Sequence, residues 1–555
     1  MAINIIIIYF SYIFLSFSVI GYGNLFSNLI FKKKLNYGFL GLLGIFILIL
    51  YSYLSHFFYP HNALHNLIFM FLGFVSFFFN TKKNFFEILL TLLIFSILFI
   101  SIIIFKTHDD FPYYHFGYSH YLTQSSLTIG IGMFNHGFRT PSAIFYLNSL
   151  FYLPLIKYYF FHLPAILILG YANIVFICNL KKNFKKNNIN FVSYFILLSI
   201  LFINIFFYRI AEHGTDRSAQ ILLLVVVAEL LAFILIGEIK NEKLSKIFLL
   251  IALIVSFKAF YVLYVVLLIP IILILKKKLE IKEFFLLLLK NRGLQLSLLM
   301  FVLILLTNFF NTGCLIYPVN QICFSNLDWS IPNSEIIRMK EWYQQWSKAG
   351  AGPDFRVDNP EIYIQSFNWV GHWIDEYFFN KVSDFLLGII TLMLIVGLTF
   401  HTKKKITSRI NNNILLLLLF LVMLFFEWFY NHPSLRYGGY TLIASIFFII
   451  ASIKFKSFVI DKNKIKKKFI YLVAFSFLIF FCRNAVRINN EILQYNFNPL
   501  KNFSFRVTNH HYRIENGINE YIENYKNCKL RENNCKKDML PKIEKVFNIY
   551  KFNIN

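Results

Sequence analysis

The sequence predicts an all-α polytopic membrane protein of about 14 transmembrane helices, with an external loop domain and a soluble external C-terminal tail. Of the 555 residues, 57% are hydrophobic and only 15% are charged, and the mean hydropathy is +0.59. A soluble protein rarely has so little polar surface, so lipid must be the solvent for much of this chain. The net charge of +26 follows a topological pattern that supports the same class.

That positive charge falls in short lysine clusters between the apolar runs, which is the pattern of cytoplasmic loops under the positive-inside rule. Because the clusters are separated by apolar runs, they argue against a nucleic-acid partner. The first apolar run lacks a basic start and a small-residue cleavage site, which predicts a retained helix rather than a signal peptide. The clusters include Lys32–Lys34, Lys82–Lys83, Lys276–Lys278, Lys403–Lys405 and Lys466–Lys468.

Residues 1–310 are predicted to form an N-terminal transmembrane region, because a span needs roughly 20 apolar residues and such runs recur here. Ser142–Tyr159 is predicted to be amphipathic. Ile247–Leu275 is too long for one helix and has basic clusters at both ends, which predicts a tight hairpin turning near Lys258. The other predicted spans are Ile3–Phe31, Tyr37–Leu54, Leu64–Phe79, Phe85–Phe105, Leu163–Leu180, Phe191–Phe207, Ala219–Ile236 and Leu294–Phe310.

Residues 311–382 are polar and mixed, which predicts an external loop domain. Residues 383–482 are predicted to be a C-terminal transmembrane region, and 483–555 an external soluble tail with short helices at Ile514–Tyr525 and Lys542–Phe552. The spans predicted in the C-terminal region are Phe385–Phe400, Ile414–Phe429, Tyr440–Ile453 and Ile470–Phe481.

Four of the six cysteines lie in segments predicted to be external. The pairs Cys314–Cys323 and Cys528–Cys535 are each close enough in sequence to form a disulfide in an oxidising compartment. Unpaired thiols are the alternative for both pairs. Cys178 and Cys482 lie in or beside predicted spans.

The first external loop, residues 106–142, is the richest segment in groups that take protons or bind anions. Asp109 and Asp110 directly follow a span, and a carboxylate pair at a membrane face can act as a general base with or without a divalent metal. His115 is a candidate metal ligand or hydrogen-bond partner. The alternative is a helix end with solvated acids and an interfacial histidine.

Further candidates lie in other predicted outer loops, where Arg is favoured for bidentate phosphate recognition. Each candidate also has a structural alternative. The segment Gly130–Arg139 can be a plain loop, Asp216 and Arg217 can pair with each other, and Lys258 can extend its ammonium group to the membrane surface. The glycines near residue 130 follow no strand, which excludes a dinucleotide fingerprint. Glu427 is a candidate partner for one of the cations. The candidate phosphate or substrate contacts are His136, Arg139, Asp216, Arg217, Lys258, His432 and Arg436.

This arrangement resembles the GT-C glycosyltransferases, which use sugars linked to polyprenyl phosphate. Asp109 and Asp110 match the acidic first external loop of that superfamily, although here the loop follows about the fourth span. The phrases FNHGFRTPS, GTDRSAQ, GCLIYP and HPSLRYGGY resemble a poorly characterised bacterial family of polytopic proteins associated with surface polysaccharides. The resemblance covers most of residues 1–482 and implies a GT-C-like fold.

The resemblance implies an enzyme of the bacterial inner (plasma) membrane whose active site faces the periplasm or outside. It would move a sugar from a polyprenyl-phosphate donor to a glycan or lipid-linked acceptor with inversion, using Asp109 or Asp110 as base. The cations would neutralise the leaving phosphate, and Mg²⁺ or Mn²⁺ is an optional cofactor held by Asp109, Asp110 and His115. The alternatives are an O-antigen polymerase or ligase using Arg338, Arg356 and His372, and a lipid or sugar transporter.

Overall fold

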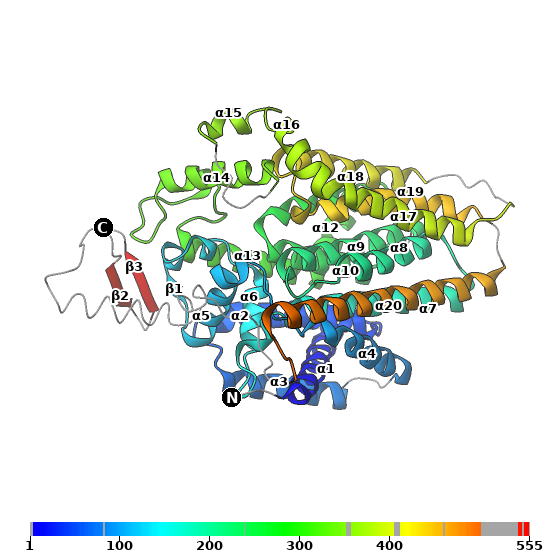
Figure 1. Ribbon diagram of the computed structural model, residues 1–555, viewed down its shortest axis with the longest axis horizontal. Coiled ribbons are helices and arrows are strands. Elements are labelled where there is room, and N and C mark those ends of the chain that lie inside the picture. Colours follow the sequence, from blue (N-terminus) through cyan, green and yellow to red (C-terminus); the bar gives the residue numbers. More distant parts are fainter. Residues whose placement is uncertain are drawn as a thin grey trace.

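The computed structural model describes residues 4–80, 84–237, 239–350, 357–403, 411–458, 461–500, 542–546 and 549–553. Most of the long helices lie side by side, and α14 (Asn333–Lys348) and α15 (Pro360–Ile364) lie at one end (Figure 1). The remaining helices are α1 (Ile5–Ile30), α2 (Tyr37–His56), α3 (Ala63–Asn80), α4 (Phe85–Leu98), α5 (Phe116–Gln124), α6 (Ala143–Leu150), α7 (Leu163–Lys185), α8 (Phe191–Phe206), α9 (Gly214–Ile236), α10 (Asn241–Phe257), α11 (Ile269–Lys276), α12 (Ile281–Leu289), α13 (Arg292–Thr312), α16 (Val370–Trp373), α17 (Ser383–Phe400), α18 (Asn412–Asn431), α19 (Gly439–Lys456) and α20 (Lys462–Tyr495).

Many of these helices are long and apolar enough to cross a membrane. Ten meet that criterion by length and composition within the described residues, and three shorter apolar helices join them. The polytopic helical class is therefore confirmed, and the count of about 14 spans stays a prediction. The ten are Ile5–Ile30, Tyr37–His56, Leu163–Lys185, Gly214–Leu235, Ala259–Lys276, Arg292–Thr312, Val370–Phe400, Asn412–Asn431, Gly439–Lys456 and Asn463–Tyr495.

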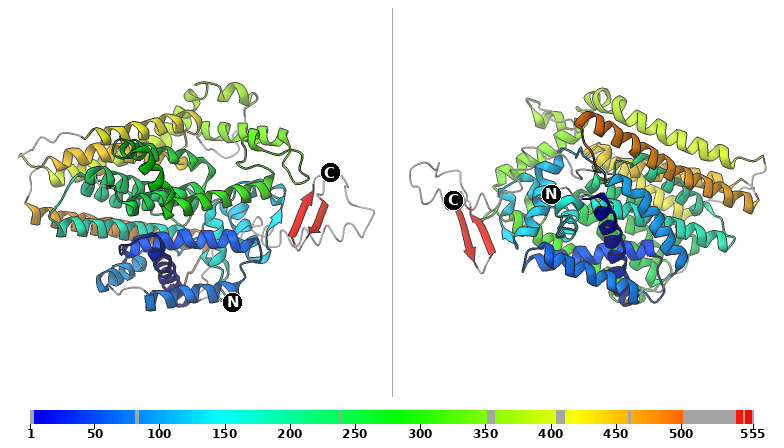
Figure 2. Two further views of the ribbon diagram at one scale, coloured as in Figure 1. Left: turned by 180° about the vertical axis from the view of Figure 1, so that it is seen from behind. Right: turned by 60° about the horizontal axis from the view of Figure 1, so that its bottom comes forward.

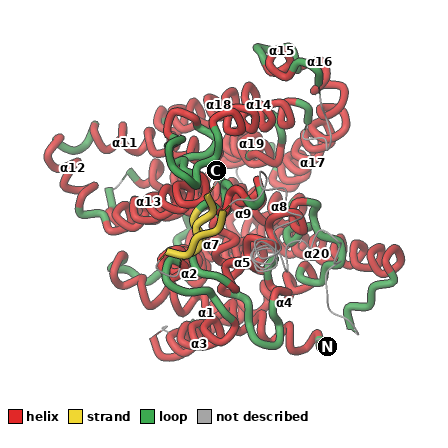
Figure 3. Tube along the Cα trace, turned by 90° about the vertical axis from the view of Figure 1, so that its left-hand side faces the viewer, coloured by secondary structure: helices red, strands yellow, loops and turns green. Residues whose placement is uncertain are grey.

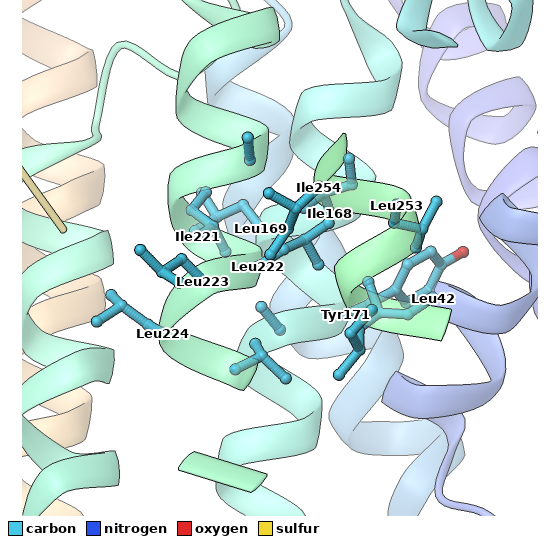
Figure 4. Packing of buried hydrophobic residues seen from close by; sticks show 14 of the residues in the cluster. Leu42, Ile168, Leu169, Tyr171, Ile221, Leu222, Leu223, Leu224, Leu253 and Ile254 are labelled. Carbon is cyan, nitrogen blue, oxygen red and sulfur yellow. The ribbon is translucent and has the colours of Figure 1, made fainter. Parts of the chain in front are cut away.

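The centre of the bundle is formed by α2, α7, α9 and α10. Figure 4 shows Leu42, Tyr171, Leu222 and Leu253 from these four helices packed together. Lipid is as apolar as these side chains, so close van der Waals contact rather than water exclusion must hold such helices together. Gly23 permits this contact between α1 and α2, because a Cβ there would collide with the carbonyl oxygen of Leu40.

Among the described residues, lysines from several of these turns lie at the end of the bundle opposite residues 106–142. Lys33, Lys182 and Lys246 are close enough to influence one another electrostatically, and they come from three separate segments. Lys278 donates a hydrogen bond to the carbonyl of Gly237 at the same ends of α9 and α11. The chain therefore separates lysine-rich turns from the acidic loop, as the positive-inside pattern predicts.

The hairpin predicted near Lys258 is confirmed. Helix α10 ends at Phe257, Lys258 is extended with φ −161° and ψ 137°, and a 3₁₀ segment, η6 (Ala259–Leu268), leads into α11. The boundary predicted at residue 382 falls inside one continuous helical segment, because α16, the π-helical η8 (Ile374–Val382) and α17 follow one another without a break.

Two local predictions are wrong. The segment predicted to be amphipathic contains α6, whose eight residues are all buried against α2 and α5. Lys542–Phe552 is not a helix: β2 (Lys542–Val546) and β3 (Ile549–Asn553) pair antiparallel, and β3 pairs parallel with β1 (Thr128–Ile129) of the first external loop. The small sheet lies beyond the loop end of the bundle (Figures 2 and 3). Ile514–Tyr525 lies outside the described residues.

Candidate functional site

Asp110 lies at the start of a π-helical turn in the first external loop. This turn, η2 (Phe111–His115), closes when the amide of Phe116 donates to the carbonyl of Phe111. π-Helical turns are rare in proteins, and many of those that occur lie at functional sites. The side chain of Asp110 is partly buried, whereas the neighbouring Asp109 is exposed and makes no hydrogen bond or ion pair with the described residues. The structure therefore separates the roles of two carboxylates that the sequence leaves equivalent.

Asp110, Asp216, Lys258 and Arg436 form one ion cluster. Arg436 Nη2 donates to Asp110 Oδ2 at 2.8 Å, and Arg436 Nε donates to Asp216 Oδ2 at 3.0 Å. Lys258 Nζ donates to the second oxygen of Asp216. The four groups come from the first loop, the start of α9, the α10–η6 break and the loop before α19. Two negative and two positive charges thus lie together and balance one another.

The two carboxylates of this cluster differ in exposure. The side chain of Asp216 is 7% exposed and is held by two cations, whereas that of Asp110 is 27% exposed and is held by Arg436. Burial raises the pKa of Asp110, but Arg436 together with His115 and His108 outweighs that effect and lowers the pKa to about 2. Asp110 is therefore the ionised carboxylate that a ligand can reach, and Asp216 positions the two cations.

Lys258 and Arg436 are both partly buried, and their pKa values shift in opposite directions. Burial is the larger influence on Lys258 and lowers its pKa despite Asp216. For Arg436 the attraction of Asp216 and Asp110 exceeds the effect of burial, so its pKa is raised. The Lys258 ammonium lies 4.6 Å from the ring centroid of Tyr437. A cation in such a setting stabilises negative charge more strongly than it would in water.

The loop that carries Arg436 is held by buried aromatic side chains. The indole N–H groups of Trp428 and Trp373 each donate at 2.9 Å, to the carbonyls of Ser434 and Pro433 respectively. The amide of Leu435 donates to the Tyr377 hydroxyl at 2.9 Å. With these backbone groups fixed, the position of Arg436 is set before any ligand binds, as catalytic groups require.

Histidines and a tryptophan border the cluster. His108 Nδ1 lies 3.4 Å from Asp110 Oδ2, and its ring contacts that of His213 at 5.0 Å. Burial lowers the pKa of His115 to about 3, so His115 is neutral beside Asp110. The guanidinium carbon of Arg436 lies 5.3 Å from the ring centroid of Trp346 on α14. Helix α14 thus covers part of the site.

Several predicted residues are placed elsewhere. Arg139 is engaged away from the cluster: its Nη1 donates to Tyr317 at 2.8 Å and to Glu335 at 2.9 Å. His136 is hydrogen-bonded to the Tyr113 hydroxyl at 2.8 Å. Both residues link loops and have no contact with Arg436.

The remaining outer-loop predictions also have definite partners. His432 contacts the rings of Phe260 and Tyr437, and burial lowers its pKa to about 4. Glu427 accepts from Asn431 at 3.1 Å and not from a cation. Asp216 and Arg217 do not pair with each other: the Arg217 guanidinium lies between two aromatic rings.

The alternative site residues do not converge. Arg338 is 74% exposed and pairs with Glu335, and His372 is hydrogen-bonded to Tyr363 at 3.1 Å. Arg356 lies outside the described residues. Within the part of the chain that the structure describes, no group of three or more His, Cys, Asp or Glu side chains could hold a metal ion. The optional metal on Asp109, Asp110 and His115 therefore stays a prediction without a preformed ligand set.

The Cys314–Cys323 disulfide is present, directly after α13, and Cys178 and Cys482 are free. The predicted Cys528–Cys535 pair lies outside the described residues. Sequence reasoning missed Trp346 and Tyr437 as neighbours of the site. Tyr437 follows Arg436 directly and was a detectable signal, whereas Trp346 sits on an ordinary amphipathic helix that shows no sequence sign of this role.

The fold and the cluster define a polytopic helical membrane protein with a buried, charge-balanced site at one end of the bundle. The chain belongs to a family described as a domain of unknown function, DUF8201, whose model matches residues 4–443. That match contains all four cluster residues. No curated protein and no solved structure matches the chain.

Proposed function

We propose that the protein is an integral membrane glycosyltransferase that takes a sugar from a polyprenyl-phosphate donor and transfers it to a glycan or lipid-linked acceptor. The observation that carries this proposal is the Asp110–Arg436–Asp216–Lys258 cluster. It combines an accessible ionised carboxylate with two cations at the end of apolar helices. A lipid-linked phosphate would lie at that level with its chain beside the helices.

In the proposed reaction Asp110 accepts the proton of an acceptor hydroxyl. The hydroxyl oxygen forms a bond to the anomeric carbon while the bond from that carbon to the phosphate oxygen breaks, with inversion. The electron pair leaves on the phosphate, which Arg436 and Lys258 stabilise. Asp216 keeps both cations in position.

Arg436 also links donor binding to base strength. In the free protein it holds the pKa of Asp110 at about 2, which makes the carboxylate a weak base. A donor phosphate competes with Asp110 for the same guanidinium. When Arg436 turns to the phosphate, its influence on Asp110 falls, and the pKa of the carboxylate rises toward the range useful for general base catalysis.

Asp110→Asn, with Asp109→Asn as the matched control, tests the base assignment. Purified protein would be given a panel of undecaprenyl-phosphate-linked sugars and acceptor glycans, and release of undecaprenyl phosphate would be followed by mass spectrometry. Loss of a general base costs about 10²–10⁴-fold in rate, whereas the exposed Asp109 should be replaceable within about twofold. Equal losses in both variants would contradict the assignment to Asp110. Absence of turnover for every donor, together with a continuous water path between the two faces, would favour a transporter.

A further inference from the structure

Arg217 occupies an unusual position beside the cluster. It follows Asp216 in the first turn of α9, yet neighbouring helical residues point about 100° apart, and its guanidinium faces other elements. The guanidinium carbon lies 4.3 Å from the ring centroid of Phe207, at the end of α8, and 4.2 Å from that of Tyr440, at the start of α19. The two rings are nearly perpendicular, with centroids 6.0 Å apart and planes at 83°, so the guanidinium lies in the corner that they form.

The Arg217 guanidinium has no hydrogen-bond or ion-pair partner among the described residues. Its Nη1 atom is fully buried and unpaired, while the residue as a whole is partly exposed. An unpaired buried donor on a cation is costly and calls for a missing partner. Other arginines have carboxylates: Arg139 pairs with Glu335, Arg209 with Glu212, Arg436 with Asp110 and Asp216, and Arg487 with Glu491.

We infer that Arg217 is the docking point for a phosphate group. A planar guanidinium held against these two rings presents parallel N–H donors that match two oxygens of a phosphate. The partly exposed side chain leaves an approach for such a ligand. Arg436 and Lys258 are already balanced by carboxylates, so the first uncompensated cation that a phosphate meets here is Arg217.

The residues around Arg217 favour a membrane lipid as the source of the phosphate. Helix α17 packs against α8, and the ring of Phe206 lies against Gly388 of α17. On α17, Leu387 and Leu394 are 62% and 59% exposed, as side chains in contact with acyl chains are. A lipid lying along α17 would bring its phosphate to the ends of α8 and α9. The inference rests on the proposed function only in identifying this phosphate with that of the sugar donor.

The test measures phosphate binding rather than transfer. Full-length protein in uncharged detergent is titrated with undecaprenyl phosphate, phosphatidylglycerol and inorganic phosphate, and thermal stabilisation gives a Kd for each. We expect Arg217→Gln to weaken undecaprenyl phosphate binding at least about tenfold, and Arg217→Lys to weaken it less because the charge remains. Arg483→Gln is the matched control: Arg483 also stacks on a ring, that of Tyr208 at 3.8 Å, but it is exposed and donates to the carbonyl of Ile205.

Each outcome decides the inference. Loss of binding in Arg217→Gln, with wild-type binding in Arg483→Gln, supports the inference. Thermal stabilisation by inorganic phosphate would show that a free phosphate is sufficient. Thermal stabilisation by the two lipids alone would identify the ligand as a lipid headgroup. Wild-type affinity in Arg217→Gln, or an equal loss in Arg483→Gln, would overturn it. A lower melting temperature of unliganded Arg217→Gln with binding retained would also overturn it, by making Arg217 a structural clamp. Phosphate binding is measured without turnover, so failure of the transfer mechanism is distinguishable from failure of this site.

Discussion

At the scale of single residues, Asp110 should make the stability of the fold depend on pH. Burial raises its pKa, but Arg436 together with His115 and His108 outweighs this and lowers the pKa to about 2, against about 3.9 in an unfolded chain. A depressed folded-state pKa stabilises the fold fully above about pH 4, and this stabilisation is lost as the pH falls toward about 2. The difference corresponds to about 2 kcal/mol. In detergent, the melting temperature of the wild-type protein should therefore exceed that of Asp110→Asn at neutral pH, and the difference should disappear in acid.

Asp109→Asn is the control for that pH series, because the exposed Asp109 makes no ion pair with the residues that the structure describes. If the difference in melting temperature between wild type and Asp110→Asn stays constant down to about pH 2, then Arg436 does not hold Asp110 as the geometry indicates.

The members of the site could be predicted from the sequence, but their pairing could not. Asp110, Asp216, Lys258 and Arg436 are each polar residues at the end of an apolar run, which is a local signal. Their contacts join positions far apart along the chain, and only the packed bundle brings these positions together. Adjacency was misleading as well, because the helical turn directs Asp216 and Arg217 to different neighbours.

At the scale of elements, an ion pair should help to hold α14 over the site, beside the apolar packing of Ile336 and Met339. Glu335, in the first turn of α14, accepts from Arg139 at 2.9 Å, and this pair is largely buried. Glu335→Gln removes a charged hydrogen bond, which is typically worth about 1.5–3 kcal/mol. Hydrogen–deuterium exchange in Asn333–Lys348 should then be about tenfold faster or more, while exchange in α9 stays unchanged.

Arg338→Gln is the comparison for that exchange experiment. It removes the other partner of Glu335, but Arg338 is 74% exposed, and exposed pairs contribute little. Equal acceleration in both variants would mean that the surface charge of α14, rather than its attachment to the first loop, controls its opening.

Element prediction succeeded where local periodicity decides and failed where distant pairing does. The break at Lys258 was predictable, because a lysine within an apolar run must reach a membrane face or a partner. The strands at residues 542–553 were not, although Ile, Val, Tyr and Phe favour strands there, because the partner strand at Thr128–Ile129 lies more than 400 residues away. Burial of α6 likewise depends on α2 and α5 rather than on its own sequence.

At the scale of the whole molecule, the two ends of the bundle should face different compartments. The described lysine-rich turns gather at one end, and the ion cluster, the disulfide and α14 lie at the other, so the positive-inside rule predicts that the site faces outside. Single cysteines at Asn326 and Lys277, both exposed, report the two ends once the free and tail cysteines are replaced by serine. A membrane-impermeant maleimide added to intact cells, with the outer envelope permeabilised if one is present, should label Asn326→Cys. Lys277→Cys should react only after the inner membrane is opened. The reverse pattern would put the site in the cytoplasm, where the polyprenyl-phosphate donor would have to be presented from the opposite leaflet and the disulfide would not persist.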